Sequence, residues 1–434
     1  MKKGAGNGVA DGEARDAHAR PHGTPDAADA RDARPHGTPV GSRAPRDRIA
    51  KVRLGDVATQ VRGVSYKPDD ASEQKTADNV TLLRANNITE NGLVLDDLVY
   101  VDADRVSGKQ YLQCGDILVC ASSGSKKVIG KACFVESGIG ATFGAFCKVV
   151  RPKANLILPK YLAQYFQSPI YRAEISRLAN GASINNIRSE HLDNLEFPLP
   201  PLPAQQRIAD ELDQLCALKK NAEDRLAILD QIVKSRFVEM FGDAKFTEHE
   251  LVEICHFIDY RGKTPTKSGS GIPLITAKNV RKDGFHIEPR EFIPEELFES
   301  WMTRGYPRAG DVLFTTEAPL GNVCRIPELH ERFAVGQRIV TLQPNLEFLN
   351  AVYLERALLS DGFQRKLFQK SSGSTVTGIR SKLLERLTIP IPPLSLQREF
   401  AAFVAEIDKS KVTLRETVAT LDQLYRAKLQ EYFR

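Results

Sequence analysis

Two long segments carry apolar side chains at alternating steps of three and four residues, the spacing of a helix that packs on another helix. The first segment spans residues 204–241 and the second spans residues 396–433. The side chains predicted to form the helix–helix interface are Ile208, Leu212, Leu215, Leu226, Leu229 and Val233 in the first segment and Phe400, Val404, Ile407, Leu414, Val418 and Leu421 in the second. Two matching stripes in one chain predict that the helices pack on each other, whereas the simpler alternative is that each helix covers only its own domain.

Both stripes are interrupted at the same place by a lysine, Lys219 in the first and Lys411 in the second. A lysine in such a stripe either fixes the register of the two helices or extends its ammonium group to solvent. The sequence does not decide between these roles. Prolines precede each stripe and end the preceding strand, and Ser395 is the predicted N-cap of the second helix.

The similarity of the two segments extends along most of the chain. "FPLPPLPAQQRI" at 197–208 and "IPIPPLSLQREF" at 389–400 are separated by 192 residues, and the triplets Ile187-Arg188-Ser189 and Ile379-Arg380-Ser381 have the same separation. The chain is therefore predicted to be a duplication of one domain followed by one helix. The predicted boundaries are a disordered tail at 1–47, a first domain at 48–203, a helix at 204–243, a second domain at 244–394 and a helix at 395–434.

Within each domain, short strand-like runs alternate irregularly with helical ones. "GDILVCA" at 115–121 and "GDVLFTT" at 310–316 are predicted strands introduced by a Gly-Asp turn. The irregular order of elements favours an α+β fold over a regular βαβ sheet. If a pseudo-two-fold axis relates the repeats, the two long helices form an antiparallel coiled coil between two homologous domains.

Composition narrows the possible functions. Residues 1–47 are nearly empty of large apolar side chains and contain "RPHGTP" twice, which predicts a disordered tail. A net charge of +5 over 434 residues is too small for DNA binding by bulk charge alone, so any such contact must come from local clusters. Seven cysteines without a CxxC pair and no apolar run of membrane-spanning length predict a cytoplasmic protein that binds no membrane.

Motifs for catalysis are weak. The letters Pro68-Asp69 and Glu73-x-Lys75 fit a metal-dependent nuclease, but they lie in one polar run that is too short to fold back as two strands. "GSKKVIGK" at 124–131 lacks the glycine spacing of a phosphate-binding loop. The sequence therefore predicts neither a catalytic residue nor a metal site nor a cofactor in this chain.

The two proline-to-helix junctions resemble the signature of the specificity subunit of type I restriction-modification systems. The resemblance covers about residues 50–434, although Arg398-Glu399 departs from the usual order in the second junction. It implies that each domain reads one half of a split DNA target, while the helix pair sets the gap and docks the partner subunits. The implied partners are double-stranded DNA, two methyltransferase subunits and two restriction subunits, which use S-adenosylmethionine, ATP and Mg²⁺. The chain itself would be non-catalytic.

Polar loops that contain glycine are the predicted base-reading elements, because Arg, Lys, Asn, Gln, Ser and Thr contact base edges. The predicted DNA-binding residues are Ser122, Ser123, Ser125, Lys126, Lys127, Asn185, Asn186, Arg188, Thr315, Thr316, Asn322, Ser374, Thr375, Thr377 and Arg380. The loops differ between the repeats, with Lys126 and Lys127 opposite Ala318 and Pro319, which predicts an asymmetric target. Because Arg188 and Arg380 match, a phosphate contact or a structural role is favoured for them, and an ordinary solvated loop remains the alternative throughout.

Two other functions remain open at this stage. The chain could be a scaffold that binds proteins rather than DNA, or an enzyme that acts alone.

Overall fold

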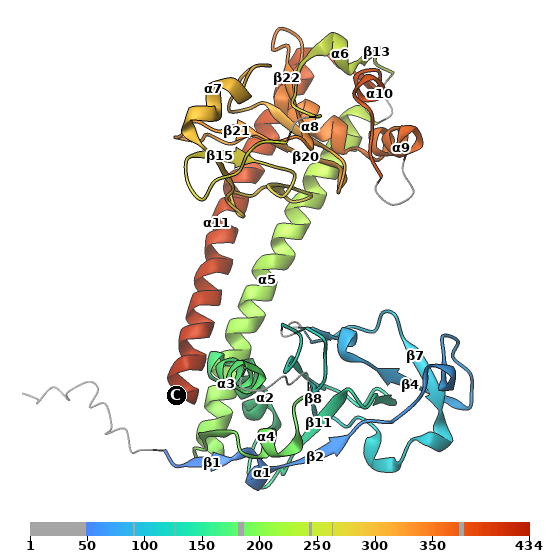
Figure 1. Cartoon of the computed structure of the whole chain (residues 1–434), viewed down its shortest axis with the longest axis vertical. Helices are drawn as coiled ribbons and strands as arrows, with labels where there is room; N and C mark the ends of the chain where they lie inside the picture. Colours follow the sequence, from blue (N-terminus) through green and yellow to red (C-terminus); the bar gives the residue numbers. More distant parts are fainter. Residues whose placement is uncertain are drawn as a thin grey trace, which may run out of the picture. The chain divides into compact units, whose positions relative to one another are not determined.

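Both apolar stripes form long helices in the computed structural model, which describes residues 49–434 except 90–91, 126, 181–185, 243–244, 263 and 373–376, and the side chains of 179–180. The predicted tail at 1–47 lies outside the described residues. Helix α5 spans Leu202–Phe241 and helix α11 spans Leu394–Phe433, each with forty residues. The two helices lie side by side and are in contact over their length (Figure 1).

Each long helix begins one or two residues earlier than the sequence predicted. The residues at the N-cap are Pro201 for α5 and Pro393 for α11, and neither makes a side-chain capping hydrogen bond. The prediction that Ser395 is an N-cap is therefore wrong. The reason is that the proline, with its fixed φ, already stands at the helix start and places Ser395 inside the first turn.

The N-terminal domain, from β1 to β12, is built on an antiparallel sheet whose described strands have the order β2, β11, β8, β9. Their bounds are Ala58–Arg62 (β2), Cys147–Pro152 (β11), Ile117–Cys120 (β8) and Ala132–Phe134 (β9). A second sheet has the order β10, β4, β7, β3, in which β10 and β4 are parallel. Its bounds are Ala141–Phe143 (β10), Asn79–Leu83 (β4), Val99–Asp102 (β7) and Ala71–Ser72 (β3).

Short strand pairs, helices and 3-10 turns complete the N-terminal domain. The strand pairs are β1 (Lys51–Arg53) with β12 (Glu196–Pro198) and β5 (Ile88–Thr89) with β6 (Gly92–Leu93). The helices are α1 (Leu54–Val57), α2 (Pro159–Gln167), α3 (Pro169–Asn180) and α4 (Ser189–Asp193). The 3-10 turns are η1 (Pro68–Asp70), η2 (Ala85–Asn87), η3 (Ala103–Arg105) and η4 (Gly108–Gln110).

The C-terminal domain, from β13 to β23, repeats this plan. Its main sheet has the order β14 (Cys255–Asp259), β22 (Ile339–Pro344), β19 (Val312–Thr316), β20 (Leu320–Arg325). The second sheet has the order β18 (Phe292–Ile293), β15 (Ile272–Ile275), β21 (Ala334–Val335), and β15 and β21 are again parallel. The remaining pairs are β13 (Glu248–Glu250) with β23 (Thr388–Pro390) and β16 (Val280–Arg281) with β17 (Gly284–Phe285). The other elements are α6 (Leu251–Ile254), η5 (Glu295–Leu297), α7 (Phe298–Trp301), α8 (Ala351–Leu359), α9 (Asp361–Lys370) and α10 (Ser381–Glu385).

The Gly-Asp turns before β8 and β19 show why the sequence forms these strands where it does. Gly115 and Gly310 have φ of +91° and +87°, a conformation that favours glycine. Asp116 then accepts a 2.8 Å hydrogen bond from the backbone N–H three residues earlier, and Asp311 does the same in the repeat. The turn closes on its own side chain, so the buried strand can begin at the next residue.

The domains share a mixed architecture of largely antiparallel sheets with helices, so each has the α+β character that the sequence predicted. Each also has a main apolar core in which one face of the antiparallel sheet packs on helices. Side chains from both long helices are part of each of these cores. The geometry of the two domains therefore depends on how α5 and α11 are fastened to them.

Candidate nucleic-acid interface

Gln205, in the first turn of α5, fastens this helix to the N-terminal domain. Its side-chain oxygen accepts a 2.8 Å hydrogen bond from the N–H of Leu158. Its side-chain amide donates to the carbonyls of Pro200, at 2.8 Å, and Leu156, at 3.4 Å. Because the Gln205 side chain is buried, these bonds replace those it would make with water.

Gln397 makes the same three contacts at the start of α11. Its oxygen accepts from the N–H of Asn350 at 2.8 Å, and its amide donates to the carbonyls of Pro392 and Phe348 at 2.7 and 2.9 Å. All four residues stand 192 positions after their counterparts. Both glutamines lie within the proline-to-helix junctions, but their role was not predicted from the sequence. Their equal position in both copies, just after the prolines, is the signal that identifies them.

The far end of each long helix enters the core of the other domain. Phe433, at the end of α11, packs against Tyr161 of the N-terminal domain with ring centroids 5.1 Å apart. Phe241, at the end of α5, packs against Tyr353 of the C-terminal domain at 5.0 Å. These are again equivalent residues of the two repeats. The alternative in which each helix covers only its own domain is therefore wrong.

Ion pairs between α5 and α11 show what the two lysines that interrupt the apolar stripes do. Lys219 Nζ lies 2.7 Å from Asp422 Oδ1, and Lys411 is paired with Asp230. As the residue number rises on one helix it falls on the other, so the helices are antiparallel. Asp230 and Asp422 are separated by 192 residues, as the lysines are, which makes the two bridges equivalent. Lys411 is only 3% exposed, so it does not extend freely into solvent.

The predicted helix–helix residues all lie at buried or half-buried positions. The buried ones are Leu212, Val233, Phe400 and Val404. The half-buried ones are Ile208, Leu215, Leu226, Leu229, Ile407, Leu414, Val418 and Leu421. The buried residues belong to the domain cores. Away from these cores, two helices alone cannot cover the side chains between them completely, so residues there are half-buried.

The two candidate loops of the N-terminal domain lie next to each other. Ser122, after β8, forms an antiparallel bridge with Asn186, before α4. The N–H of Ile187 donates to the carbonyl of Ala121 at 2.7 Å. Segments more than 60 residues apart in the chain are thus joined into one surface at the end of the main sheet.

The repeat joins the corresponding loops of the C-terminal domain in the same way. Glu317, after β19, bridges to Gly378, before α10, and the N–H of Ile379 donates to the carbonyl of Thr316 at 3.1 Å. The two repeats therefore place the same pair of loops together on the same scaffold.

Each of the three residues in the Ile-Arg-Ser triplets has a different role in this arrangement. Ile187 and Ile379 are buried, whereas Arg188 and Arg380 are exposed. The Ser189 hydroxyl accepts a 2.8 Å hydrogen bond from Lys148 Nζ. An apolar anchor and a tethered serine thus fix the backbone on either side of an exposed arginine.

The second tether, at Ser381, uses a half-buried ion pair between Asp259, the last residue of β14, and Arg261. Ser381 donates to Asp259 Oδ2 at 2.6 Å, and Arg261 donates to the same carboxylate and to the Ile379 carbonyl. Burial alone would raise the pKa of Asp259, but the hydrogen bonds from Arg261 and Ser381 outweigh burial and lower this pKa below its ordinary value. The carboxylate therefore stays charged and holds the loop at neutral pH.

The N-terminal loops present polar side chains at the domain surface. Ser125, Lys127, Asn186 and Arg188 are exposed, while Ser122 and Ser123 are half-buried. The Ser123 hydroxyl accepts a 3.1 Å bond from the N–H of Ser125 and so shapes the loop. Arg188 lies 3.4 Å from Glu190 in an exposed pair. The predicted residues Lys126 and Asn185 lie outside the described residues.

Three predicted contacts in the C-terminal domain do not reach its surface. Thr315, Thr316 and Asn322 are buried. The Thr315 hydroxyl accepts from the N–H of Asn322 at 2.8 Å, and the Asn322 amide donates to the Val280 carbonyl at 3.0 Å. Thr316 donates to the Arg338 carbonyl at 3.2 Å. The prediction that they meet a base edge failed because strands β19 and β20 extend into the expected loop and turn these side chains inward.

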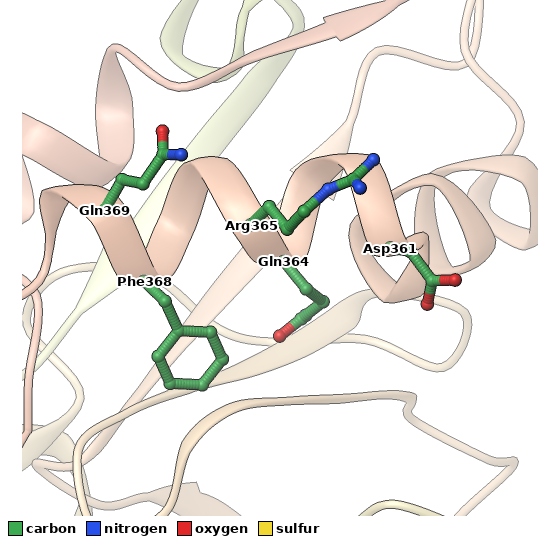
Figure 2. A pocket seen from close by; sticks show the side chains of 5 residues that line it. All are labelled: Asp361, Gln364, Arg365, Phe368 and Gln369. Carbon is green, nitrogen blue, oxygen red and sulfur yellow. The ribbon is translucent and has the colours of Figure 1, made fainter.

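The remaining predicted residues of the C-terminal domain are on its surface or outside the described part. Thr377 and Arg380 are exposed. Ser374 and Thr375 lie outside the described residues. The adjoining helix α9 carries a shallow depression lined by Asp361, Gln364, Arg365, Phe368 and Gln369, which Figure 2 shows along one side of the helix.

Gln364 connects this helix to the start of β20. Its side-chain amide donates to the carbonyl of Gly321 at 3.0 Å. The depression itself is open and holds no cluster of general acids, bases or nucleophiles. Among the residues that the structure describes, no group of three or more His, Cys, Asp or Glu side chains lies close enough to hold a metal ion.

Comparison with known proteins identifies the family. Residues 47–228 and 245–423 each match the family described as the type I restriction modification DNA specificity domain. The chain therefore belongs to this family, with two copies of its domain.

The relatives include specificity subunits, one of which is similar over most of its length. The specificity subunit of the type I restriction enzyme EcoKI from Escherichia coli K12 is 29% identical over 409 residues, which cover 88% of this chain and 87% of the relative. The specificity subunit of StySPI from Salmonella potsdam is 38% identical over 185 residues, covering 43% of this chain and 40% of the relative.

Solved structures show the same fold. A chain from work on complex assembly and conformational transition of the type I R-M system has a TM-score of 0.52 and 19% identity, and the match covers 92% of this chain and 99% of that one. The S subunit of a type I restriction-modification system from M. genitalium has a TM-score of 0.51 and 15% identity, with 89% and 97% covered. In the described part of the chain, no helix is both long and apolar enough to cross a bilayer.

Proposed function

We propose that this chain is the DNA sequence-recognition subunit of a type I restriction-modification complex. Each domain reads one half of a bipartite, asymmetric target. One observation carries this assignment: the two domains join the same pair of loops on the same scaffold, yet the loops present different side chains. Two domains that recognise different half-sites need the same backbone scaffold and different contact residues. A scaffold that binds proteins would not require this combination.

The proposed contacts divide by the chemistry of their side chains. Ser125, Lys127, Asn186 and Thr377 are exposed on the joined loops and carry groups that hydrogen-bond to base edges. Arg188 and Arg380 are the same in both domains, so they suit the phosphate backbone, which is the same at every sequence. The buried residues Thr315, Thr316 and Asn322 are assigned to the scaffold instead.

The helix pair is the proposed spacer between the half-sites, in the form of an antiparallel coiled coil. A forty-residue helix is about 60 Å long, which exceeds one turn of B-DNA at about 34 Å. The equivalent bridges Lys219–Asp422 and Lys411–Asp230 support a fixed register. Two weak half-site contacts on one stiff connection produce an affinity that depends strongly on the gap.

The same helices are the proposed docking surface for the partner subunits. Leu218, Ile228, Ile232 and Val238 of α5 are exposed, although large apolar side chains are costly to leave in water. We assign two methyltransferase subunits and two restriction subunits as partners, with double-stranded DNA as the ligand. This chain carries out no chemical step and holds no cofactor, and the partner subunits use S-adenosylmethionine, ATP and Mg²⁺.

An exchange of domains tests the assignment. Residues 244–394 are replaced by the corresponding domain of another family member, and methylated adenines are mapped across the genome of cells that make the complete complex. The expected result is a target in which one half changes and the other half stays the same. The matched control replaces residues 48–203 and changes the opposite half. A target in which both halves change, or neither does, contradicts independent reading.

A further inference from the structure

A large apolar side chain stands exposed beside the candidate loops of the N-terminal domain. Phe146, in the turn before β11, is 69% exposed. Its carbonyl accepts hydrogen bonds of 2.9 Å from the N–H groups of both Ala121 and Ser122. The backbone of Phe146 therefore holds the start of the Ser122–Lys127 loop, and its side chain lies next to that loop without being part of the core.

The equivalent residue of the C-terminal domain is Arg338, 192 positions later. Its carbonyl accepts from the N–H of Thr316 at 3.0 Å, which matches the contact of Phe146. The Arg338 side chain is 53% exposed, and its Nε lies 3.1 Å from Glu317 Oε1. An arginine thus takes the place of a phenylalanine on an equivalent backbone.

The surroundings of these two positions are equivalent in detail. Two residues earlier, Gly144 donates its N–H to the carbonyl of Leu83 at 2.9 Å, and Gly336 donates to the carbonyl of Ile275 at 2.8 Å. The residues that follow, Cys147 and Ile339, are both buried. The scaffold has kept its apolar and glycine positions while the exposed side chain between them has changed its chemistry completely.

The two side chains suit different bases. A phenylalanine edge makes apolar contact with the C5-methyl group of thymine, whereas an arginine donates two parallel hydrogen bonds to guanine O6 and N7. The ion pair with Glu317 orients the Arg338 guanidinium. Because exposed ion pairs contribute little to stability, breaking this pair costs little free energy. The Arg338 guanidinium thus already contacts a residue of the joined loops and can exchange this partner for a base.

We infer that Phe146 and Arg338 are specificity-determining residues at one equivalent position of the two readers. Phe146 selects thymine in the half-site read by the N-terminal domain, and Arg338 selects guanine in the other half-site. This inference rests on the proposed function and adds to it two residues that do not belong to the polar loops themselves.

The test uses the full chain assembled with its methyltransferase subunits. The wild-type target is mapped first by its methylated adenines. Binding is then measured for duplexes in which single thymines are replaced by deoxyuridine, which lacks the methyl group, or single guanines by 7-deazaguanine, which lacks the N7 acceptor. The wild-type complex should lose affinity at one thymine of one half-site and at one guanine of the other.

Phe146→Ala should abolish the response to deoxyuridine, and Arg338→Ala should abolish the response to 7-deazaguanine. Each variant should relax discrimination at a single base pair by about 5- to 100-fold. Leu346→Ala and Arg290→Ala, which alter an exposed leucine and an exposed, paired arginine elsewhere in the C-terminal domain, should leave every preference unchanged.

The outcomes separate the inference from the function on which it rests. If Phe146→Ala and Arg338→Ala keep the wild-type base preferences, or weaken binding equally at all sequences, the inference is overturned. If the wild-type complex methylates no bipartite target, the proposed function itself fails. Phe146→Leu and Arg338→Lys keep much of the size or charge and control for folding: the first should retain the thymine preference in part, and the second should lose most of the guanine preference because lysine lacks the two-pronged geometry.

Discussion

The two domains of this chain are the same where they hold the helices and different where they are exposed beside the joined loops. Gln205 and Gln397 make identical sets of hydrogen bonds, and each domain packs a tyrosine against the last phenylalanine of the opposite helix. Phe146 and Arg338, by contrast, differ entirely in chemistry on equivalent backbones. The comparison shows two kinds of position in this duplicated fold. Positions that fasten the helices have the same residues in both copies, whereas exposed positions beside the loops can differ and bind different partners.

The two domains also differ within their main sheets, in the side chain that pairs with the aspartate of the Gly-Asp turn. In the N-terminal domain, Arg151 donates to both oxygens of Asp116 at 2.7 and 2.8 Å. In the C-terminal domain, Gln343 takes the place of this arginine and donates to Asp311 at 2.6 Å. The Gly-Asp turn is kept in both, but the side chain that donates to its aspartate across the sheet is a cation in one domain and a neutral amide in the other.

The largest expected effect comes from removing the aromatic ring at the end of a long helix. Phe433→Ala should lower the free energy of unfolding by about 3–5 kcal/mol, because it leaves a cavity beside buried Tyr161. Hydrogen exchange should accelerate in α2 of the N-terminal domain, although Phe433 follows the C-terminal domain in sequence. Phe241→Ala should instead accelerate exchange in α8, next to Tyr353.

Leu424→Ala is the matched control on the same helix, since Leu424 is exposed and should have little effect on exchange. If Phe433→Ala loosened only the C-terminal domain, the far end of α11 would not be docked in the N-terminal domain. The ends of the two long helices would then not be docked in equivalent ways.

The next largest effect is expected at the two glutamines. Gln205→Ala and Gln397→Ala each remove three hydrogen bonds and leave a buried carbonyl without its donor, which should cost about 2–4 kcal/mol. The two losses should agree to within about 1 kcal/mol in denaturant titrations, because the contacts are equivalent. Gln206→Ala and Arg398→Ala are the controls at the following, exposed positions and should have little effect. A large inequality between the two glutamines would mean that one junction has a further support.

The sequence predicted the elements that follow from a repeated local pattern. The two apolar stripes correspond to the two helices, and the Gly-Asp turns correspond to the starts of strands β8 and β19. These features depend on periodicity and turn chemistry, which neighbouring residues carry.

Other features were not predicted from the sequence, and most of them depend on where a side chain points in three dimensions. Thr315, Thr316 and Asn322 are polar residues beside a glycine, yet the ladder between β19 and β20 turns them inward. Asp230 and Asp422 could have been identified as partners of the lysines, because they keep the same 192-residue offset. Ser395 looked like a helix cap because serine commonly serves as one, but the proline before it begins the helix.

A smaller effect is expected where the two cross-helix bridges differ. Lys411 is 3% exposed and Lys219 is 33% exposed, although the bridges are equivalent in sequence. Lys411→Glu should therefore destabilise the protein more than Lys219→Glu, by about 1–3 kcal/mol against less than about 1 kcal/mol, because a buried charge without a partner is costly. The reversed pair Lys411→Glu with Asp230→Lys should recover part of the loss. Equal losses at Lys411 and Lys219 in unfolding titrations would show that burial does not distinguish the bridges.

The smallest effect is the dependence of stability on pH, and it has opposite signs at two aspartates. The hydrogen bond from Lys219 lowers the pKa of Asp422 below its ordinary value of 3.8. The stability that this group contributes is therefore complete above about pH 5 and is lost as the pH falls through the lowered pKa. Burial raises the pKa of Asp311 above 3.8, and the hydrogen bonds from the Gln343 amide and the Arg308 N–H offset this only in part. The ionised form of Asp311 is therefore unfavourable in the fold, and acid relieves that cost.

Urea midpoints measured between about pH 3 and 6 test both signs. Asp422→Asn should flatten the loss of stability in acid, because it removes a group whose charge favours the folded state. Asp311→Asn should steepen that loss, because it removes a group that gains stability on protonation. If both variants changed the slope in the same direction, the lysine and the glutamine would not set the two aspartates apart, and the contrast between a cation-paired and an amide-paired carboxylate would not hold in this fold.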